Sequence, residues 1–247
     1  MPAHNSAQFI RAAIASVRQQ TMSDWELLVS DDASSDNTVG IVSHMASGDN
    51  RIRILIGARN TGPAEARNRA IEASSGRYIA FLDSDDLWKP TKLERQLGFM
   101  QARNIAFSFS SYDRVTEDGQ TLGSVHVEKP VDYRTLLKSC VIGCLTAVYD
   151  TRMVGKVYMP EIRRRQDFGL WLKLLKQVEY AHPIPESLAT YRVRTGSTSF
   201  NKVVAAQYTW RLYRQVERLP VHEAAYYFMH YAARGLWSRY GTPRRDQ

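Results

Sequence analysis

The chain has 247 residues, of which 44% are hydrophobic, and it carries a formal net charge of +8. This length suits one large α/β domain with or without an appendage, and no apolar run approaches the roughly 18 residues of a membrane-spanning helix. Residues 1–5 are polar and lack the apolar core of a signal peptide, so we expect a cytoplasmic protein. Cys140 and Cys144, without further Cys or nearby His, make a poor zinc site, and we expect reduced, packed thiols.

The first third of the chain alternates between helical and strand patterns. Hydrophobic residues recur at intervals of three and four over residues 8–18, which predicts an amphipathic helix capped by Asn5 or Ser6. Residues 25–30 read as a strand that ends in Asp31 and Asp32, and further patterns predict a helix from 38 to about 45, a strand at 52–56 and a helix at 63–73. This alternation predicts an α/β fold with a mostly parallel sheet flanked by helices.

Residues 78–82 form an apolar run that leads directly into three carboxylates, Asp83, Asp85 and Asp86. Such a run predicts a buried strand of a parallel sheet, and ligands bind beyond the carboxyl ends of such strands. Carboxylates one residue apart can share a divalent cation that bridges phosphate oxygens, whereas the alternative is a solvated turn that caps the next helix. Asp31 and Asp32 would emerge at the same edge, and two acidic pairs there need cations or hydrogen-bond donors.

The middle of the chain is less regular. It predicts a helix at 91–103, a strand at 105–110, a turn at 117–120, a short strand at 125–127, a helix at 133–139 and a strand at 146–149. Asp167 begins another helix, where a carboxylate meets the positive end of the helix dipole, so a plain capping role is the alternative to catalysis. Residues 191–199 form a polar loop with two cations, Arg192 and Arg194.

The last fifth of the chain combines basic and aromatic residues. Its basic residues outnumber its acids, which suits an anionic partner such as a membrane surface, a nucleic acid or a phosphorylated substrate. Helices with aromatic and Arg side chains can lie in a membrane interface, or they can pack as a hairpin on the main domain. The two alternatives are compatible if only one face of the helices packs on the main domain. The aromatic residues are Tyr208, Trp210, Tyr213, Tyr226, Tyr227, Phe228, Tyr231, Trp237 and Tyr240.

Taken together, these stretches resemble glycosyltransferase family 2, whose members are inverting, use nucleotide sugars and have a GT-A fold. The resemblance covers residues 2–199, with 201–247 as a C-terminal amphipathic helical extension. Residues 87–90 and 142–146 are more specifically similar to transferases of bacterial surface polysaccharides such as teichuronic acid, capsule and O-antigen. The motifs are Pro2-Ala3-His4-Asn5, Asp31-Asp32 with residues 33–38, Asn60-Thr61-Gly62 with Ala66-Arg67-Asn68, residues 76–86, and Gln166-Asp167 with Leu170-Trp171.

The resemblance implies a role for each matching residue. Asp85 would hold Mn²⁺ or Mg²⁺ on the diphosphate, and Asp167 would be the general base that deprotonates the acceptor hydroxyl. Asp32 would accept a hydrogen bond from the uracil N–H, and Arg194 would help to neutralise the leaving diphosphate. The residues expected to bind the nucleotide sugar are Pro2, His4, Asn5, Asp32, Arg67, Asp83, Ser84 and Arg194.

The sequence departs from the family pattern at four places. His4 stands where Tyr is commoner, Gln166 where Glu is commoner, and Arg194 where His is common. The family also begins with an apolar strand before the Pro motif, and here only Met1 precedes Pro2. Because loss of a central strand exposes the backbone groups of its neighbours, we predict that a version extended upstream is more stable. Equal melting temperatures would refute this prediction.

The expected function is therefore transfer of a sugar from a UDP-sugar to a saccharide acceptor in bacterial surface-polysaccharide synthesis. We expect an undecaprenyl-diphosphate-linked acceptor and an enzyme that is peripheral on the inner face of the membrane through its C-terminal helices. A sugar nucleotidyltransferase is an alternative, but it would need a Gly-rich phosphate loop, and residues 2–6 contain no Gly. A nucleic-acid-binding module could use aromatic stacking platforms, but the acidic edge would repel phosphates, so no nucleic acid is expected.

Overall fold

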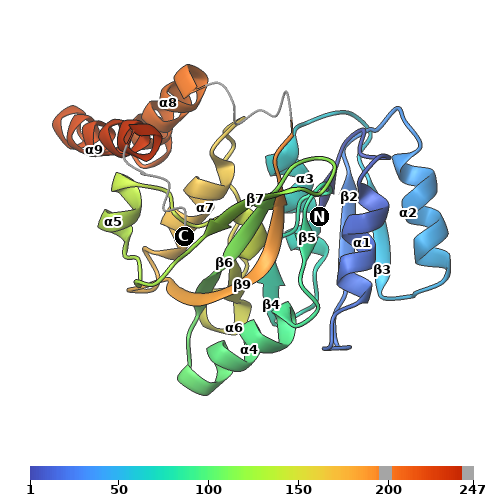
Figure 1. The fold of residues 1–247 in the computed structure, drawn as a ribbon. Helices are drawn as coiled ribbons and strands as arrows, with labels where there is room; N and C mark the ends of the chain where they lie inside the picture. The colour runs from blue at the N-terminus through green and yellow to red at the C-terminus, as the bar shows by residue number, and fades with distance from the viewer. Residues whose placement is uncertain (195–201, 241–247) are drawn as a thin grey trace.

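The computed structural model describes residues 1–194 and 202–240 (Figure 1). These residues form two β-sheets with helices packed around them. The first sheet and its helices lie at one end of the molecule, and helices α8 and α9 lie at the other (Figure 1). Besides α1 and α2, which are described below, the helices are α3 (Pro63–Ala73), α4 (Lys92–Arg103), α5 (Tyr133–Lys138), α6 (Thr151–Val154), α7 (Gln166–Leu174), α8 (Lys202–Arg211) and α9 (Val221–Tyr240). A short helical turn η1 (Cys144–Thr146) and a π-helical segment η2 (Leu212–Val216) complete the described helical residues.

The first sheet is parallel throughout, as the sequence predicts. Its order is β1 (Pro2–Ala3), β2 (Leu27–Asp31) and β3 (Ile52–Ile56), joined through helices α1 (Ile10–Arg18) and α2 (Thr38–Ser47). All five residues of β2 are buried, which explains its continuous apolar run. β1 pairs with the last residues of β2, so the loops that follow both strands begin at the same edge of the sheet.

The second sheet corrects the predicted strand directions. Its order is β4-β8-β6-β9-β5, with β7 beside β6, and among these pairs only β6 and β9 are parallel. The strand before the acidic turn is antiparallel to its partner β8, so its assignment to a parallel sheet was wrong, because an apolar run reports burial and not the direction of a neighbour. The strands are β4 (Tyr78–Ala80), β5 (Leu87–Trp88), β6 (Phe107–Val115), β7 (Thr121–Val125), β8 (Val148–Asp150) and β9 (His182–Arg192).

Helix α7 passes through the larger hydrophobic core. Trp171 is fully buried, and its ring lies 5.4 Å from the centroids of both Phe81 and Phe107. Gly169 allows α7 to approach the preceding loop, because a Cβ there would lie 2.4 Å from Cγ of Pro160. The start of α7, which carries Asp167, is therefore held by a tightly packed helix.

The C-terminal helices pack on the main domain through one face. Leu212, Tyr213 and Ala224 are fully buried members of the same core as Trp171, and the Tyr213 hydroxyl donates a hydrogen bond to the Leu137 carbonyl. The predicted boundary near residue 200 lies outside the described residues, as do the side chains of Trp237 and Tyr240. Within residues 1–194 and 202–240, no helix is long and apolar enough to cross a membrane.

Candidate active site

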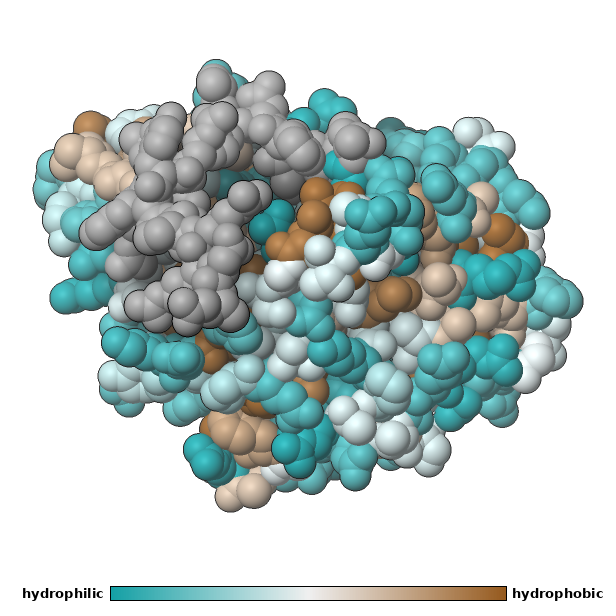
Figure 2. Space-filling view, viewed as in Figure 1, coloured by the Kyte–Doolittle hydropathy of each residue, from teal (hydrophilic) through white to brown (hydrophobic). Residues whose placement is uncertain are grey.

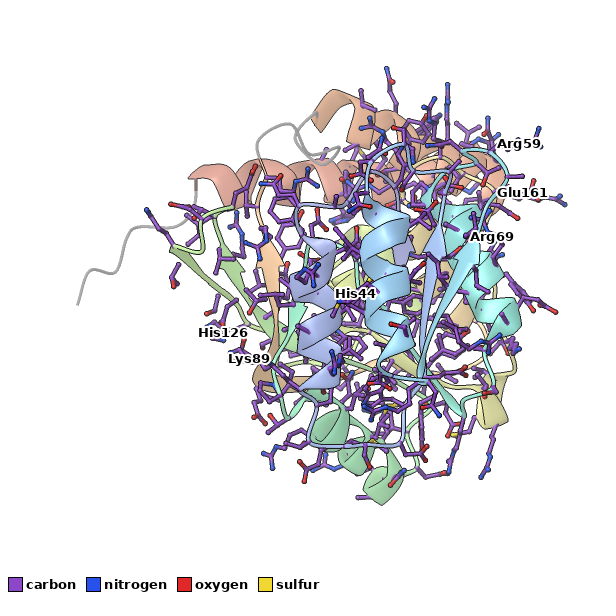
Figure 3. All side chains as sticks on the ribbon, turned by 90° about the vertical axis from the view of Figure 1, so that its right-hand side faces the viewer. His44, Arg59, Arg69, Lys89, His126 and Glu161 are labelled. Carbon is purple, nitrogen blue, oxygen red and sulfur yellow. The ribbon has the colours of Figure 1, made fainter. Side chains whose placement is uncertain are left out.

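A cleft of about 1460 Å³ opens where the loops after β1, β2 and β4 meet the start of α7. Its far wall is formed by residues 161–167 and by α8. Arg59 and Glu161 line this cleft and project at the same rim of the molecule (Figure 3). Nine of the ten residues predicted to form the site line it: Pro2, His4, Asp32, Arg67, Asp83, Ser84, Asp85, Asp167 and Arg194.

Asp32 stands at the end of β2 and holds the loop before α3. Its carboxylate accepts hydrogen bonds from the N–H groups of Thr61 at 3.1 Å and Gly62 at 2.6 Å, and Arg69 donates to it at 3.4 Å. Gly62 has a φ of 95°, a conformation that favours glycine. Burial alone would raise the pKa of Asp32, but the hydrogen bonds from Thr61 and Gly62 outweigh it and lower that pKa.

Asn5 differs from the other predicted residues because it does not line the cleft. Its φ is 48°, and its side-chain oxygen accepts hydrogen bonds from the N–H groups of Ser35 at 2.8 Å and Asp36 at 3.3 Å. Its neighbour His4 donates from Nδ1 to the Asp32 carbonyl at 2.9 Å. Asn5 thus fixes the loop after β1 against the loop after β2, and His4 and Pro2 form the wall beside them.

The acidic turn at residues 83–86 is tied to cations on both sides. Asp83 forms a salt bridge with Arg67, and Asp85 forms one with Arg194 at 3.1 Å. Burial and then repulsion from Asp83 raise the pKa of Asp85. Asp86 is almost fully buried, and burial followed by repulsion from Asp83 and Asp85 raises its pKa well above the usual value. Repulsion of this kind is relieved when a cation binds between the carboxylates.

Asp86 and Arg192 connect this turn to β9. The Asp86 carboxylate accepts a hydrogen bond from the Arg192 N–H at 2.9 Å, and the Arg192 side chain donates to the Asp85 carbonyl at 3.0 Å. The Arg192 and Arg194 guanidinium groups lie 5.1 and 4.8 Å from the centroid of the Phe9 ring. The end of β9 therefore positions both the acidic turn and Arg194.

Arg67 places a buried positive charge in the wall of the cleft. The residue is 6% exposed, and two of its nitrogens, Nε and Nη1, are buried without a hydrogen-bond partner in the structure. Burial would lower its pKa, but the charge of Asp83 outweighs burial and raises that pKa, so Arg67 stays protonated. Unsatisfied N–H groups on a fixed cation make a ready site for an anion.

Asp167 comes to the cleft from a separate element. It lies in the first turn of α7, and one of its carboxylate oxygens accepts a hydrogen bond from the Phe168 N–H at 2.8 Å. Arg165, just before the helix, has a φ of 65°. The side chain of Asp167 is half-buried, so a substrate hydroxyl in the cleft has access to it.

The acidic turn fits a divalent metal ion that shares its coordination with a ligand. Among residues 1–194 and 202–240 there is no cluster of three His, Cys, Asp or Glu side chains able to hold an ion alone. Mg²⁺ is commonly held by one or two carboxylates, with phosphate oxygens and waters as its other ligands. The carboxylates of Asp83 and Asp85, both in the cleft wall, provide such a donor set.

Comparison with known proteins identifies the family of this chain. Residues 1–156 match the model of glycosyl transferase family 2. The chain belongs to glycosyltransferase family 2. This glycosyltransferase is 42% identical over 239 residues to the putative teichuronic acid biosynthesis glycosyltransferase TuaG of Bacillus subtilis (strain 168), with 96% of this chain and 95% of the relative covered. It is 37% identical over 237 residues to the UDP-Glc:alpha-D-GlcNAc-diphosphoundecaprenol beta-1,3-glucosyltransferase WfgD of Escherichia coli, with 96% of this chain and 92% of the relative covered.

Solved structures of other glycosyltransferases share the fold. Residues 1–349 of TarS from S. aureus in complex with UDP match with a TM-score of 0.69 at 17% identity, covering 92% of this chain and 68% of that chain. Mannosyltransferase PcManGT from Pyrobaculum calidifontis, in complex with GDP-Man and Mn²⁺, matches with a TM-score of 0.68 at 16% identity, covering 98% and 74%. The GT-A fold predicted for this glycosyltransferase is therefore confirmed, as is its class of enzyme.

Several residues that line the cleft or support its walls were not predicted to act there. Arg69 holds Asp32, Asp86 and Arg192 position the acidic turn, and Arg163 to Arg165 form part of the far wall. Asp86 lies within the predicted motif, so its signal was present. Strand β9 was missed because it contains Pro183 and Pro185, and proline within a run of residues argues against a central strand.

Proposed function

We propose that this glycosyltransferase moves a hexosyl group from a UDP-sugar to a saccharide acceptor linked to a lipid diphosphate such as undecaprenyl diphosphate, with inversion at the anomeric carbon. The observation that carries the proposal is a single cleft that joins an acidic turn, a buried arginine and a carboxylate from a separate helix. The name of one relative, WfgD, describes transfer from UDP-Glc to alpha-D-GlcNAc-diphosphoundecaprenol and supports this acceptor class.

In this proposal the chain binds the donor at the end of the cleft near β1 and β2. Pro2 and His4 contact the base together with the loop that Asp32 holds, Asp83 and Ser84 lie toward the ribose, and Arg67 and Arg194 face the phosphates. A bound Mn²⁺ or Mg²⁺, held by Asp85 with Asp83 nearby, would stabilise the negative charge that develops on the diphosphate. Asn5 acts from behind the cleft wall by holding the two loops together.

The transfer itself is one displacement. The acceptor oxygen forms a bond to the anomeric carbon as the bond from that carbon to the phosphate oxygen breaks, and UDP leaves with the bonding electron pair. Asp167 takes the proton of the attacking hydroxyl, a role that suits a carboxylate fixed by the Phe168 N–H. Arg67 and Arg194 stabilise the charge on the leaving group, so the protein supplies both the base and part of the electrostatic stabilisation.

A panel of UDP-sugars tested with a GlcNAc-diphosphate-alkyl acceptor, scored by UDP release, tests this proposal. We expect one donor to be turned over, with a fall in kcat of about 10²- to 10⁴-fold in Asp167→Asn, the usual contribution of a general base. Asp85→Asn should lose metal-dependent turnover, while Asp118→Asn, in an exposed turn outside the cleft, should behave as wild type. Absence of UDP release from every donor on a folded chain would contradict the proposal.

The C-terminal helices support a further part of the proposal, binding to the anionic inner face of the cell membrane. Val221, Tyr226 and Met229 on α9 are 59%, 45% and 64% exposed, and hydrophobic residues are visible over this region at the upper left of Figure 2. Arg211 and Arg218, near these side chains in sequence, are exposed and basic. An exposed apolar face with cations beside it suits an anionic lipid interface.

Vesicle sedimentation tests this membrane role. Deleting residues 203–247 would remove Leu212 and Tyr213 from the core, so surface substitutions are the better test. Val221→Ser with Met229→Ser should weaken binding to phosphatidylglycerol vesicles about 100-fold or more, since each buried apolar side chain contributes about 1.5–3 kcal/mol and about 1.4 kcal/mol is tenfold in affinity. Leu122→Ser, which changes an exposed apolar residue on β7, is the matched control, and equal sedimentation of all three proteins would exclude the membrane role.

A further inference from the structure

The far wall of the cleft carries three consecutive arginines, Arg163, Arg164 and Arg165, separated from Asp167 only by Gln166. At the other end of the cleft each cation that faces the acidic turn has a carboxylate partner, as Arg67 has Asp83 and Arg194 has Asp85. In the part of the chain that the structure describes, neither Arg163 nor Arg165 forms a salt bridge with a carboxylate. The far wall, residues 161–167, thus holds three arginines against two carboxylates, Glu161 and Asp167, and its net positive charge suits an anion.

Aromatic residues of the C-terminal helices orient these arginines. The Arg165 guanidinium donates a hydrogen bond to the Tyr231 hydroxyl and lies 5.4 Å from the centroid of the Tyr231 ring. The Arg164 guanidinium lies 6.0 Å from the centroid of Tyr208, and Tyr208 itself lines the cleft. Because Arg165 has a φ of 65°, its backbone is in a conformation that non-glycine residues seldom adopt and that recurs at ligand-binding sites.

The position of the arginines relative to Asp167 limits which anion they can bind. Arg165 is two residues from Asp167, so their Cα atoms are within about 7.6 Å of each other along the chain. If Asp167 takes the proton of an acceptor hydroxyl, a phosphate on the same sugar lies about one sugar ring away, within reach of an extended guanidinium. The donor phosphates, by contrast, face the acidic turn and Arg67.

We propose that Arg163, together with Arg164 held by Tyr208 and Arg165 held by Tyr231, binds the diphosphate of the lipid-linked acceptor. This inference rests on the proposed function, because it assumes that Asp167 faces the acceptor. Arginine presents several N–H donors in a planar fork that matches phosphate oxygens. The lipid then leaves the cleft beside α8 and α9, and α9 carries the exposed apolar residues Val221 and Met229.

Calorimetry with farnesyl diphosphate as the probe tests the proposal without knowledge of the acceptor sugar. The titration is done at saturating UDP and Mn²⁺, so that the donor site is filled, and inorganic pyrophosphate separates diphosphate recognition from binding of the tail. Wild type should bind farnesyl diphosphate and, more weakly, pyrophosphate. Arg164→Gln with Arg165→Gln should weaken both by about 10-fold or more, because a hydrogen bond to a charged group contributes about a factor of 10.

The matched control is Arg134→Gln with Arg152→Gln, which removes the same charge outside the cleft. It should bind farnesyl diphosphate as wild type does, and both double variants should bind UDP with unchanged affinity. Tyr231→Phe keeps the ring and removes the hydroxyl. It should lose less affinity for farnesyl diphosphate than the Arg164 and Arg165 variant does, and its affinity for UDP should be unchanged.

Three results would overturn the proposal: no binding of farnesyl diphosphate by wild type, equal binding by the Arg164 and Arg165 variant, or a parallel loss of UDP affinity that assigns the arginines to the donor. Failure of the proposed function is separate, since it would appear as absence of UDP binding or release in wild type.

Discussion

The two ends of the cleft handle charge differently. At the end proposed to bind the donor, Arg67, Arg69 and Arg194 are each paired with a carboxylate, and Asp32 and Asn5 hold the loops by accepting hydrogen bonds from their N–H groups. At the far end, Arg164 and Arg165 lie against tyrosine rings contributed by α8 and α9. Residues 1–86 and 192–194 thus organise the donor end, whereas residues 161–167 and the C-terminal helices form the far end.

This difference teaches how one cleft can serve two substrates. A metal-bound diphosphate brings its own cation, so the donor end needs carboxylates and a few fixed arginines. An acceptor phosphate that brings no metal must be neutralised by the protein, which the arginines of the far wall can do. Substitutions that act at one end should therefore leave the other end's substrate unaffected.

The largest effect of this kind is expected from Arg67→Lys. The lysine keeps the charge beside Asp83 but loses the planar fork, including the two nitrogens that lack a partner. We expect kcat/KM for the donor to fall about 10- to 100-fold, the loss of one or two charge-assisted hydrogen bonds, with the KM of the acceptor unchanged. Arg53→Lys, an exposed arginine on β3 that does not line the cleft, is the control. An equal rise in the acceptor KM would mean that the two ends are not separate.

A smaller effect, on stability rather than on binding, is expected from Gly169→Ala. The new Cβ would lie 2.4 Å from Cγ of Pro160 and 3.1 Å from Cδ1 of Leu212, so α7 must shift. Overpacking of this kind costs about 1–3 kcal/mol, and the shift should also lower kcat because α7 carries Asp167. Gly98→Ala in α4 has nothing within 4 Å of its Cβ and serves as the control. Denaturant unfolding of both variants measures the difference, and equal stabilities would show that α7 is not tightly held.

The last effect concerns only the pH dependence of stability and comes from Lys92, a fully buried cation next to η1 that donates hydrogen bonds to Gln96 and to the Thr146 carbonyl. Burial lowers its pKa to about 7. The unfolded chain therefore binds this proton more tightly than the folded chain does. The stability of the fold should rise with pH from about 7 to about 10.4, the pKa of lysine in the unfolded chain. Lys92→Met removes this group.

Thermal melting between pH 6 and 10 tests the prediction for Lys92. The melting temperature of wild type relative to Lys92→Met should rise with pH across this range. Lys89→Met, which removes a partly exposed lysine paired with Asp113, should not reproduce that trend. A constant difference between wild type and Lys92→Met would show that Lys92 keeps an ordinary pKa in the fold.

Much of the donor end was predictable from the sequence. Asp32, Asp83 and Asp85 follow strand patterns directly, and Arg67 belongs to a local motif, so neighbours in sequence reveal them. Asp167 was visible as the start of a helix with a clear hydrophobic pattern. The direction of β4 relative to its neighbour was not predictable, because an apolar run indicates burial and not the direction of the neighbouring strand. Strand β9 was not predicted, because it contains two prolines. The far wall could not be foreseen, because its arginines are oriented by Tyr208 and Tyr231, which only tertiary packing brings close.

The most direct test of the account is calorimetric titration of UDP into the folded chain with and without Mn²⁺. We predict binding that strengthens with Mn²⁺, is lost in Asp85→Asn and is retained in Asp167→Asn, because in the proposed function the acidic turn holds the metal-bound nucleotide and Asp167 acts only on the acceptor. Absence of Mn²⁺-dependent binding in the wild-type protein, or its equal loss in Asp167→Asn, would contradict this division of the cleft.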